Sequence, residues 1–216
     1  MNWITDYIEG HGEEFWQRAL KIHGYAELAG EERQSAAELC AMLEQAGFAV
    51  EQGLGSQPTA FRAVYGSGGP VIGFLCEYDA LPKLNQTEGT CYNGDGRSGH
   101  GCGHNLLGAG AMAAALGVKA YLEETGKPGT VILYGCPGEE GGAAKAFMAR
   151  DGVWKTLDAA LTWHPEDVNE VATGSSNSCI QVQYKFTGVA SHAAGAPDKG
   201  RSALDAVELM NIGVQF

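Results

Sequence analysis

The chain has 216 residues, a net charge of -12 and a pI near 4.8. This acidity argues against nucleic acid or an anionic membrane surface as a partner, because phosphate binding requires a basic face. We find no signal peptide and expect no stretch long enough to span a bilayer. The six cysteines are scattered along the chain, which indicates reduced thiols and a cytoplasmic protein.

Helical spacing of apolar residues predicts two helices at the start of the chain, over residues 3–26 and 31–46. Later in the chain, the segment 77–82 is followed by a polar loop without periodicity that extends to Ser98. A stretch rich in Gly and Ala then predicts a tightly packed helix over 104–125, and a shorter helix is expected over 143–150.

Short apolar or alternating runs bounded by Gly, Ser and Pro predict five strands, over residues 48–52, 60–65, 71–76, 130–136 and 159–163. From the third strand onward, strands and helices alternate along the chain. This order favours an α/β sheet covered by helices.

Cys102 and His104 stand two residues apart in the segment His-Gly-Cys-Gly-His-Asn. Their thiolate and imidazole are ligands that zinc favours, and the intervening glycine allows both side chains to face one ion. By itself, such a pair is also compatible with an ordinary buried thiol. Its position in the fold therefore has to decide between the two interpretations.

Other side chains able to bind a metal follow three of the predicted strands. Glu77 and Asp79 follow the third strand, Glu139 and Glu140 the fourth, and His164 the fifth. In open α/β sheets, ligands bind beyond the carboxyl ends of the strands. The Cys-x-His segment begins the helix after the third strand and should reach the same edge, so four segments together predict a metal centre.

The sequence changes character after about Asn177. Alternation over 179–188 predicts a long strand, and an amphipathic helix is expected from Ser202. That helix has no C-terminal cap, and the strand has no partner in sequence. We therefore expect the front part of a longer protein, with a second domain that is only begun.

Five motifs resemble the dinuclear metallopeptidase family of the aminoacylases and glutamate carboxypeptidases, and more narrowly its amidohydrolase branch of hippurate and auxin-conjugate hydrolases. They are Glu-Tyr-Asp-Ala-Leu-Pro at 77–82, Gly-His-Gly-Cys-Gly-His-Asn at 99–105, Gly-Cys-Pro-Gly-Glu-Glu-Gly-Gly at 135–142, Leu-Thr-Trp-His-Pro at 161–165 and Gly-Arg-Ser-Ala-Leu-Asp-Ala at 200–206. The resemblance implies a three-layer helix-sheet-helix catalytic domain whose N-terminal part is 1–177. Residues 178–216 would begin an inserted α+β lid or dimerisation domain, and one more histidine ligand would lie beyond residue 216.

The resemblance also implies roles for individual residues. The matching metal ligands are Cys102, His104, Glu140 and His164. Two divalent ions, zinc or manganese, would be the cofactors.

Three further positions carry expected roles around those ligands. Glu139 matches the general base, and His192 matches a histidine that reaches substrate from a neighbouring subunit. Asp79 is expected to orient a ligand through a hydrogen bond. The family usually has Asp-x-Asp where this chain begins with Glu77, which leaves a direct metal role for Glu77 open.

These roles predict a metal-dependent amidohydrolase acting on an N-acyl amino acid, such as the aroyl-glutamate p-aminobenzoyl-glutamate. A metal-activated water would attack the amide, with Glu139 taking its proton. His192 would donate a hydrogen bond to the oxyanion. Arg201 would bind the substrate carboxylate, or alternatively cap or salt-bridge the helix that it precedes.

Alternative functions remain open from the sequence. Within the family these are a dipeptidase or an aminoacylase; outside it, a non-catalytic partner subunit or a cysteine hydrolase using Cys102. A purely structural metal has no use for the carboxylate of Glu139 beside a ligand, which argues against the partner subunit. The expected partners are a small-molecule substrate and, through the lid, a second copy or a paralogous subunit.

Overall fold

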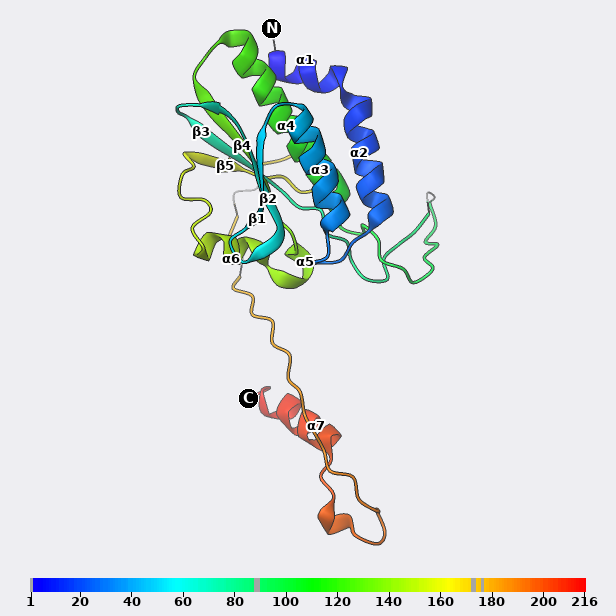
Figure 1. Cartoon of the computed structure of the whole chain (residues 1–216). Coiled ribbons are helices and arrows are strands. Elements are labelled where there is room, and N and C mark those ends of the chain that lie inside the picture. The colour runs from blue at the N-terminus through cyan, green and yellow to red at the C-terminus, as the bar shows by residue number, and fades with distance from the viewer. Residues whose placement is uncertain (1, 88–89, 172–173, 176) are drawn as a thin grey trace. The chain divides into compact units, whose positions relative to one another are not determined.

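The computed structural model describes residues 2–87, 90–171, 174–175 and 177–216 (Figure 1). The chain separates into two compact units, Met1–Asn169 and Glu170–Phe216. The first unit contains the sheet and the second contains helix α7 (Ala203–Gly213).

A mixed five-stranded sheet in the order β1-β2-β4-β3-β5 forms the centre of the first unit. β3 runs parallel to both β4 and β5, whereas β1, β2 and β4 are antiparallel neighbours. The five strands predicted within residues 48–163 are present: β1 (Ala49–Leu54), β2 (Gln57–Ser67), β3 (Val71–Cys76), β4 (Gly129–Gly135) and β5 (Ala159–Leu161).

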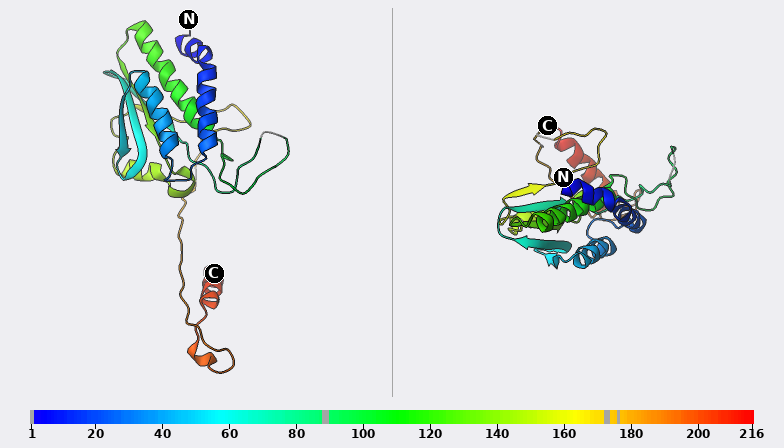
Figure 2. Two further views of the ribbon diagram at one scale, coloured as in Figure 1. Left: turned by 45° about the vertical axis from the view of Figure 1, so that its right-hand side comes forward. Right: turned by 90° about the horizontal axis from the view of Figure 1, so that it is seen from above.

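Helices cover both faces of this sheet, as Figures 1 and 2 show. One face carries α1 (Trp3–Gly10), α2 (Gly12–Tyr25), α3 (Arg33–Gln45) and α4 (His104–Thr125). The short α5 (Glu139–Gly142) leads into α6 (Ala144–Arg150), which packs Met148 on the other face. The expected helix-sheet-helix layering is confirmed.

Successive residues of the central strand β4 face opposite layers. Val131 and Leu133 belong to the core beneath α1–α4, while Ile132 and Tyr134 belong to the core beneath α6. Because side chains alternate across a strand, a strand covered on both faces is apolar at every position. This explains why residues 130–136 form one nearly continuous apolar run.

The prediction of a single helix over residues 3–26 is wrong, because α1 and α2 are separate helices that meet at His11. Glycine precedes and follows this histidine, and glycine weakens a helix interior. The His11 ring stacks on Tyr7 with the ring centroids 4.1 Å apart, and its Nδ1 lies 2.8 Å from the Tyr7 carbonyl oxygen.

The prediction of a strand over 179–188 is also wrong. These residues pair with no strand in the part of the chain that the structure describes, and backbone ladders require a partner. The helix expected from Ser202 is confirmed as α7. The Ser202 hydroxyl caps its start by accepting a hydrogen bond from the Asp205 N–H at 3.1 Å.

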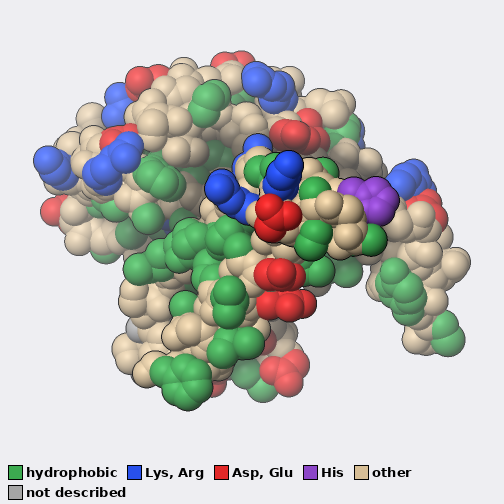
Figure 3. All heavy atoms as spheres, turned by 90° about the horizontal axis from the view of Figure 1, so that it is seen from below, with side chains coloured by type: hydrophobic (Ala, Val, Ile, Leu, Met, Phe, Trp, Pro, Cys, Tyr) green, Lys and Arg blue, Asp and Glu red, His purple; other side chains and the backbone are tan. Residues whose placement is uncertain are grey.

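Hydrophobic side chains lie exposed beside charged ones on the molecular surface in Figure 3.

Helix α4 is long and apolar enough to span a membrane by length and composition, so the expectation that no such stretch exists is wrong. Its most apolar window is 56% buried within the protein. Residues such as Met112 and Leu116 lie in the core against the sheet. This burial is typical of the core helix of a globular protein.

Glu27 caps helix α3 from outside the helix. Its carboxylate accepts hydrogen bonds from the N–H groups of Gln34 and Ser35 at 3.0 and 2.9 Å, and from the Ser35 hydroxyl at 2.8 Å. Partial burial works against the charged form, but these hydrogen bonds outweigh it and lower the pKa of Glu27 below its usual range. The carboxylate therefore satisfies N–H groups that a helix start leaves unpaired.

Replacing this cap should destabilise the fold. We expect Glu27→Ala to lower the free energy of unfolding by about 1 kcal/mol at pH 7, as lost caps do. Because the folded pKa is lowered, the charge-dependent part of this contribution is present above the unfolded pKa of about 4.3 and is lost as the pH falls through the folded pKa. Urea unfolding at pH 7 and pH 3 measures the difference in the free energy of unfolding between wild type and variant at each pH. The same difference at both pH values would contradict the assignment.

Candidate metal centre

Three parallel strands end at one edge of the sheet. The register pairs Cys76 with Gly135 and Phe74 with Leu161, so the segments after β3, β4 and β5 leave the sheet side by side. The metal-type residues predicted to follow these strands therefore lie at a common edge.

The start of α4 brings its own side chains to the same edge. Gly103 adopts a left-handed φ of +82°, and a Cβ there would come within 3.0 Å of the Pro165 ring. A Cβ on Gly110 would come within 2.8 Å of the Trp163 ring. The two glycines allow the segment around His164 to pack closely against this helix.

Three of the predicted ligands converge. The ligand atoms of Cys102, His104 and His164 all lie within 4.8 Å of one another. Cys102 Sγ is 3.2 Å from His164 Nε2, and the two imidazole rings meet edge to face with centroids 5.6 Å apart. A thiolate and two imidazoles at this spacing suit zinc or a similar cation.

Hydrogen bonds fix which ring nitrogen of each histidine faces the centre. His104 Nδ1 is 2.9 Å from Asp79 Oδ1, and His164 Nδ1 is 2.9 Å from the Pro165 carbonyl oxygen. Both oxygens are acceptors, so Nδ1 carries the proton in each ring and Nε2 presents its lone pair. Asp79 thus has the geometry expected of a residue that orients a ligand.

Glu140 joins the same cluster. Its N–H donates to Asp79 Oδ2 at 2.9 Å, so one carboxylate holds both this residue and His104. Burial, with the Glu140 carboxylate beside the thiol, raises the pKa of Cys102 to about 11. A bound cation would reverse this effect, because it stabilises the thiolate.

Glu77 and Glu139 form a second group with His104, again with the ligand atoms within 4.8 Å of one another. One oxygen of Glu77 forms an ion pair with Lys145 on α6. Sequence reasoning missed Lys145, since neither periodicity nor spacing relates it to a residue so far away in the chain. Burial and the nearby charge of Glu77 raise the pKa of Glu139.

The residues present fit a metal ion. At this edge of the sheet, three buried side-chain atoms have no hydrogen-bond partner among the described residues: Glu77 Oε2, His104 Nε2 and Glu140 Oε1. The first two lie 3.0 Å apart, but their orientation does not make a hydrogen bond. Leaving such groups unpaired is costly, whereas a divalent cation would coordinate all three.

His192 and Arg201 belong to the second unit, and their contacts are described within that unit. His192 Nδ1 accepts hydrogen bonds from the N–H groups of Ala194 and Gly195 at 3.2 and 3.0 Å. Arg201 forms no ion pair with any described residue, and Ser202 supplies the cap of α7. The alternative in which Arg201 caps or salt-bridges that helix is therefore not observed.

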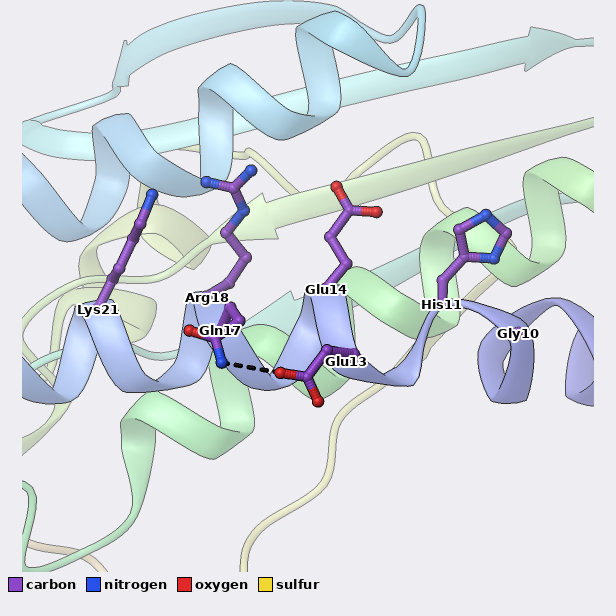
Figure 4. A pocket seen from close by; sticks show the side chains of 7 residues that line it. All are labelled: Gly10, His11, Glu13, Glu14, Gln17, Arg18 and Lys21. Carbon is purple, nitrogen blue, oxygen red and sulfur yellow. Dashed lines mark hydrogen bonds between the residues drawn. The ribbon is translucent and has the colours of Figure 1, made fainter.

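A hollow lined by residues of α2 and the turn before it lacks the features of a site (Figure 4). Its polar and charged side chains bind partners on the same or the neighbouring helix. Gln17 donates a hydrogen bond to Glu13 at 2.8 Å, and Arg18 and Lys21 form ion pairs with Glu38 on α3. These are contacts within α2 and between it and its neighbour α3. The metal-type cluster at the sheet edge remains the candidate site.

The fold and the cluster define an α/β protein with sulfur, nitrogen and oxygen groups that could hold a metal ion at one edge of its sheet. The chain belongs to the peptidase family M20/M25/M40, whose sequence pattern matches residues 73–206. Among its relatives, the B subunit of p-aminobenzoyl-glutamate hydrolase from Escherichia coli is 49% identical over 99% of this chain and 45% of that protein. The motif resemblance to the family and to its amidohydrolase branch is confirmed.

Other relatives and solved structures agree with this family. The mouse Xaa-Arg dipeptidase is 39% identical over 95% of this chain and 47% of that protein, so the chain spans just under half the length of these relatives. The aminobenzoyl-glutamate utilization protein of Klebsiella pneumoniae has the same fold, with a TM-score of 0.64 and 20% identity over 95% of this chain and 58% of that one. A dinuclear metal-binding M20 peptidase of Bacillus subtilis also has this fold, with a TM-score of 0.60 and 22% identity over 73% of this chain and 44% of that one.

Removing the orienting carboxylate should weaken metal binding. We expect Asp79→Asn to lower zinc affinity about 10- to 100-fold, because the asparagine cannot accept from both His104 Nδ1 and the Glu140 N–H. Competition with a chromophoric chelator measures the affinity. Asp95→Asn, on an exposed loop, is the control and should bind zinc like the wild type; equal affinity in both variants would contradict the role of Asp79.

Proposed function

We propose that this chain carries the metal centre of an amidohydrolase that cleaves the amide bond of an N-acyl amino acid. The observation that carries the proposal is the convergence of Cys102, His104 and His164 with unpaired carboxylate oxygens at the carboxyl edge of the sheet. The 49% sequence identity to the B subunit of p-aminobenzoyl-glutamate hydrolase from Escherichia coli supports an aroyl-glutamate, such as p-aminobenzoyl-glutamate, as the substrate.

Cys102, His104, Glu140 and His164 are the proposed metal ligands, and two zinc or manganese ions the proposed cofactors. When bound, divalent ions at such a site polarise an amide carbonyl and provide a nucleophile at neutral pH. The thiolate and imidazoles favour zinc, while the neighbouring carboxylates would accept manganese. The description of the Bacillus subtilis structure as dinuclear supports a pair of ions.

Glu139 is the proposed general base. It belongs to the cluster that contains His104, so its carboxylate stands beside the ligands without having to serve as one. It would take a proton from the attacking water and pass that proton to the leaving nitrogen. Its raised pKa brings it closer to neutral pH, which favours a group that must both accept and donate a proton.

The second unit contributes substrate-binding groups in this proposal. Residues 178–216 would begin the lid or dimerisation domain, with His192 hydrogen-bonded to the oxyanion and Arg201 paired with the substrate carboxylate. The lid would join a second copy or a paralogous subunit. The Escherichia coli relative is named as one subunit of its hydrolase, which supports a partner of this kind.

A cytoplasmic location is part of the same proposal. All six cysteines, at described positions, are free thiols. Six free thiols in one chain are typical of a protein in a reducing compartment.

A dipeptidase is the second candidate within the family. The 39% identity to the mouse Xaa-Arg dipeptidase supports it. A cysteine hydrolase is disfavoured, because the raised pKa of Cys102 keeps its thiol protonated when no cation is near.

Metal analysis tests the proposal directly. We expect the full-length protein to contain about two ions per chain, as dinuclear sites do, and to release glutamate from p-aminobenzoyl-glutamate. A chelator should abolish the release and added zinc or manganese should restore it. Activity that survives chelation and is lost only on thiol alkylation would instead support the cysteine hydrolase.

Replacing the base should separate chemistry from binding. We expect Glu139→Gln to lower kcat by about 10²- to 10⁴-fold, the usual contribution of general acid-base catalysis, and to retain the metal. Steady-state kinetics and elemental analysis of the same sample measure the two effects. Glu124→Gln, exposed near the end of α4, should match the wild type; unchanged kcat in Glu139→Gln would refute the mechanism.

A further inference from the structure

Glu32 is a buried carboxylate beneath the turn that carries Glu139 and Glu140. Its side chain is 0% exposed. One oxygen accepts hydrogen bonds from the Gly138 N–H at 2.7 Å and the Gly30 N–H at 2.9 Å, and the other accepts from the Thr59 hydroxyl at 3.0 Å. Burial of a carboxylate is costly unless it is hydrogen-bonded, and here both oxygens are bonded.

The side chain of Glu32 does not serve the helix that it precedes. Glu32 occupies the N-cap position of α3 but makes no capping hydrogen bond to it. The remote carboxylate of Glu27 bonds the first N–H groups of that helix instead. Glu32 is thereby directed toward the segment between β4 and α5, more than a hundred residues away in sequence.

The hydrogen bond between Glu32 and Gly138 falls where the backbone adopts a conformation that favours glycine. Gly138 has a left-handed φ of +61°, and a Cβ there would lie 3.9 Å from the Glu32 carboxylate and 3.6 Å from the Gly30 nitrogen. A Cβ on Gly141 would lie 3.2 Å from the Ala29 side chain. The loop that contains Gly30 and Glu32 therefore packs directly against the turn.

A second carboxylate holds the same turn two residues further along the chain. Asp79 accepts from the N–H of Glu140, and Glu32 accepts from the N–H of Gly138. Glu139 stands between these two anchored peptide groups. The direction of its side chain therefore depends on both anchors.

We propose that Glu32 is a positioning residue of the metal centre, which sets the peptide at Gly138 and hence the placement of Glu139 and Glu140. This inference rests on the proposed function only for the role of Glu139 as base. The contact with Gly138 and its effect on the ligand Glu140 do not depend on which amide is cleaved.

Three variants of the full-length protein test this role. Glu32→Met keeps the volume and removes both acceptors. Glu32→Gln keeps an oxygen for Gly138 and Gly30, while its amide nitrogen can donate to the Thr59 hydroxyl. Glu27→Ala is the matched control, because it removes another carboxylate that bonds backbone N–H groups but does not contact the turn.

We expect Glu32→Met to lower kcat at least about tenfold with little change in KM, because small misplacements of catalytic groups are costly. Zinc affinity should fall about tenfold or more, and the Gly138 amide should exchange faster with deuterium. Glu32→Gln should recover all three values to within about threefold of the wild type, as a retained acceptor restores the positioning contact. Glu27→Ala should lower only the stability.

The role is refuted if Glu32→Met and Glu27→Ala have equal kcat, zinc affinity and Gly138 exchange. It is equally refuted if Glu32→Gln is as impaired as Glu32→Met. Should Glu32→Met fail to fold, Glu32→Asp replaces it with the same expectations, because the shorter side chain keeps the charge and loses the reach. If the wild type cleaves no N-acyl amino acid, the proposed function fails, while zinc affinity and Gly138 exchange still decide the role of Glu32.

Discussion

The carboxylate of Asp79 is the contact on which the candidate metal centre depends. One of its oxygens bonds His104 Nδ1 and the other the Glu140 N–H, both at 2.9 Å. The first bond fixes the histidine tautomer, and the second fixes the start of α5. Asp79 follows β3, His104 begins α4, and Glu140 lies in α5 after β4. A single buried side chain therefore links three segments at the sheet edge by hydrogen bonds. The arrangement leaves the metal-facing atoms with no other partner among the described residues.

Charge explains how so many carboxylates can gather at this edge, with Glu77 and Asp79 buried. Glu77, Asp79, Glu139 and Glu140 lie close together, and Lys145 supplies a positive charge through its ion pair with Glu77. The backbone N–H of Glu140 donates a hydrogen bond to Asp79 and stabilises that carboxylate further. A divalent cation would offset the remaining repulsion. The fold thus keeps the edge of its sheet in a state that favours cation binding.

Local patterns predicted most of the fold and which residues gather in the candidate site at the sheet edge, and contacts distant in sequence account for the rest. The strand runs and the limits of α4 follow from periodicity, and the common edge follows from parallel strand order. The break at His11 was missed because tertiary packing and flanking glycines decide it, and residues 179–188 alternate like a strand but have no described partner. Lys145 and Glu32 act across 68 and 106 residues, and no short-range pattern records such contacts.

The order of the strands has a consequence for how the protein folds. β4 and β3 are neighbours in the sheet, although α4 and a long loop separate them in the chain. Of the four proposed ligands, only Cys102 and His104 are close in sequence, so an unfolded chain offers a cation only a weak two-ligand site from this set. The remaining ligands assemble after the non-local pairing of β3, β4 and β5, a slow step for this topology. Metal would then bind after the sheet has formed, and free metal concentration would set the balance between native and unfolded chains.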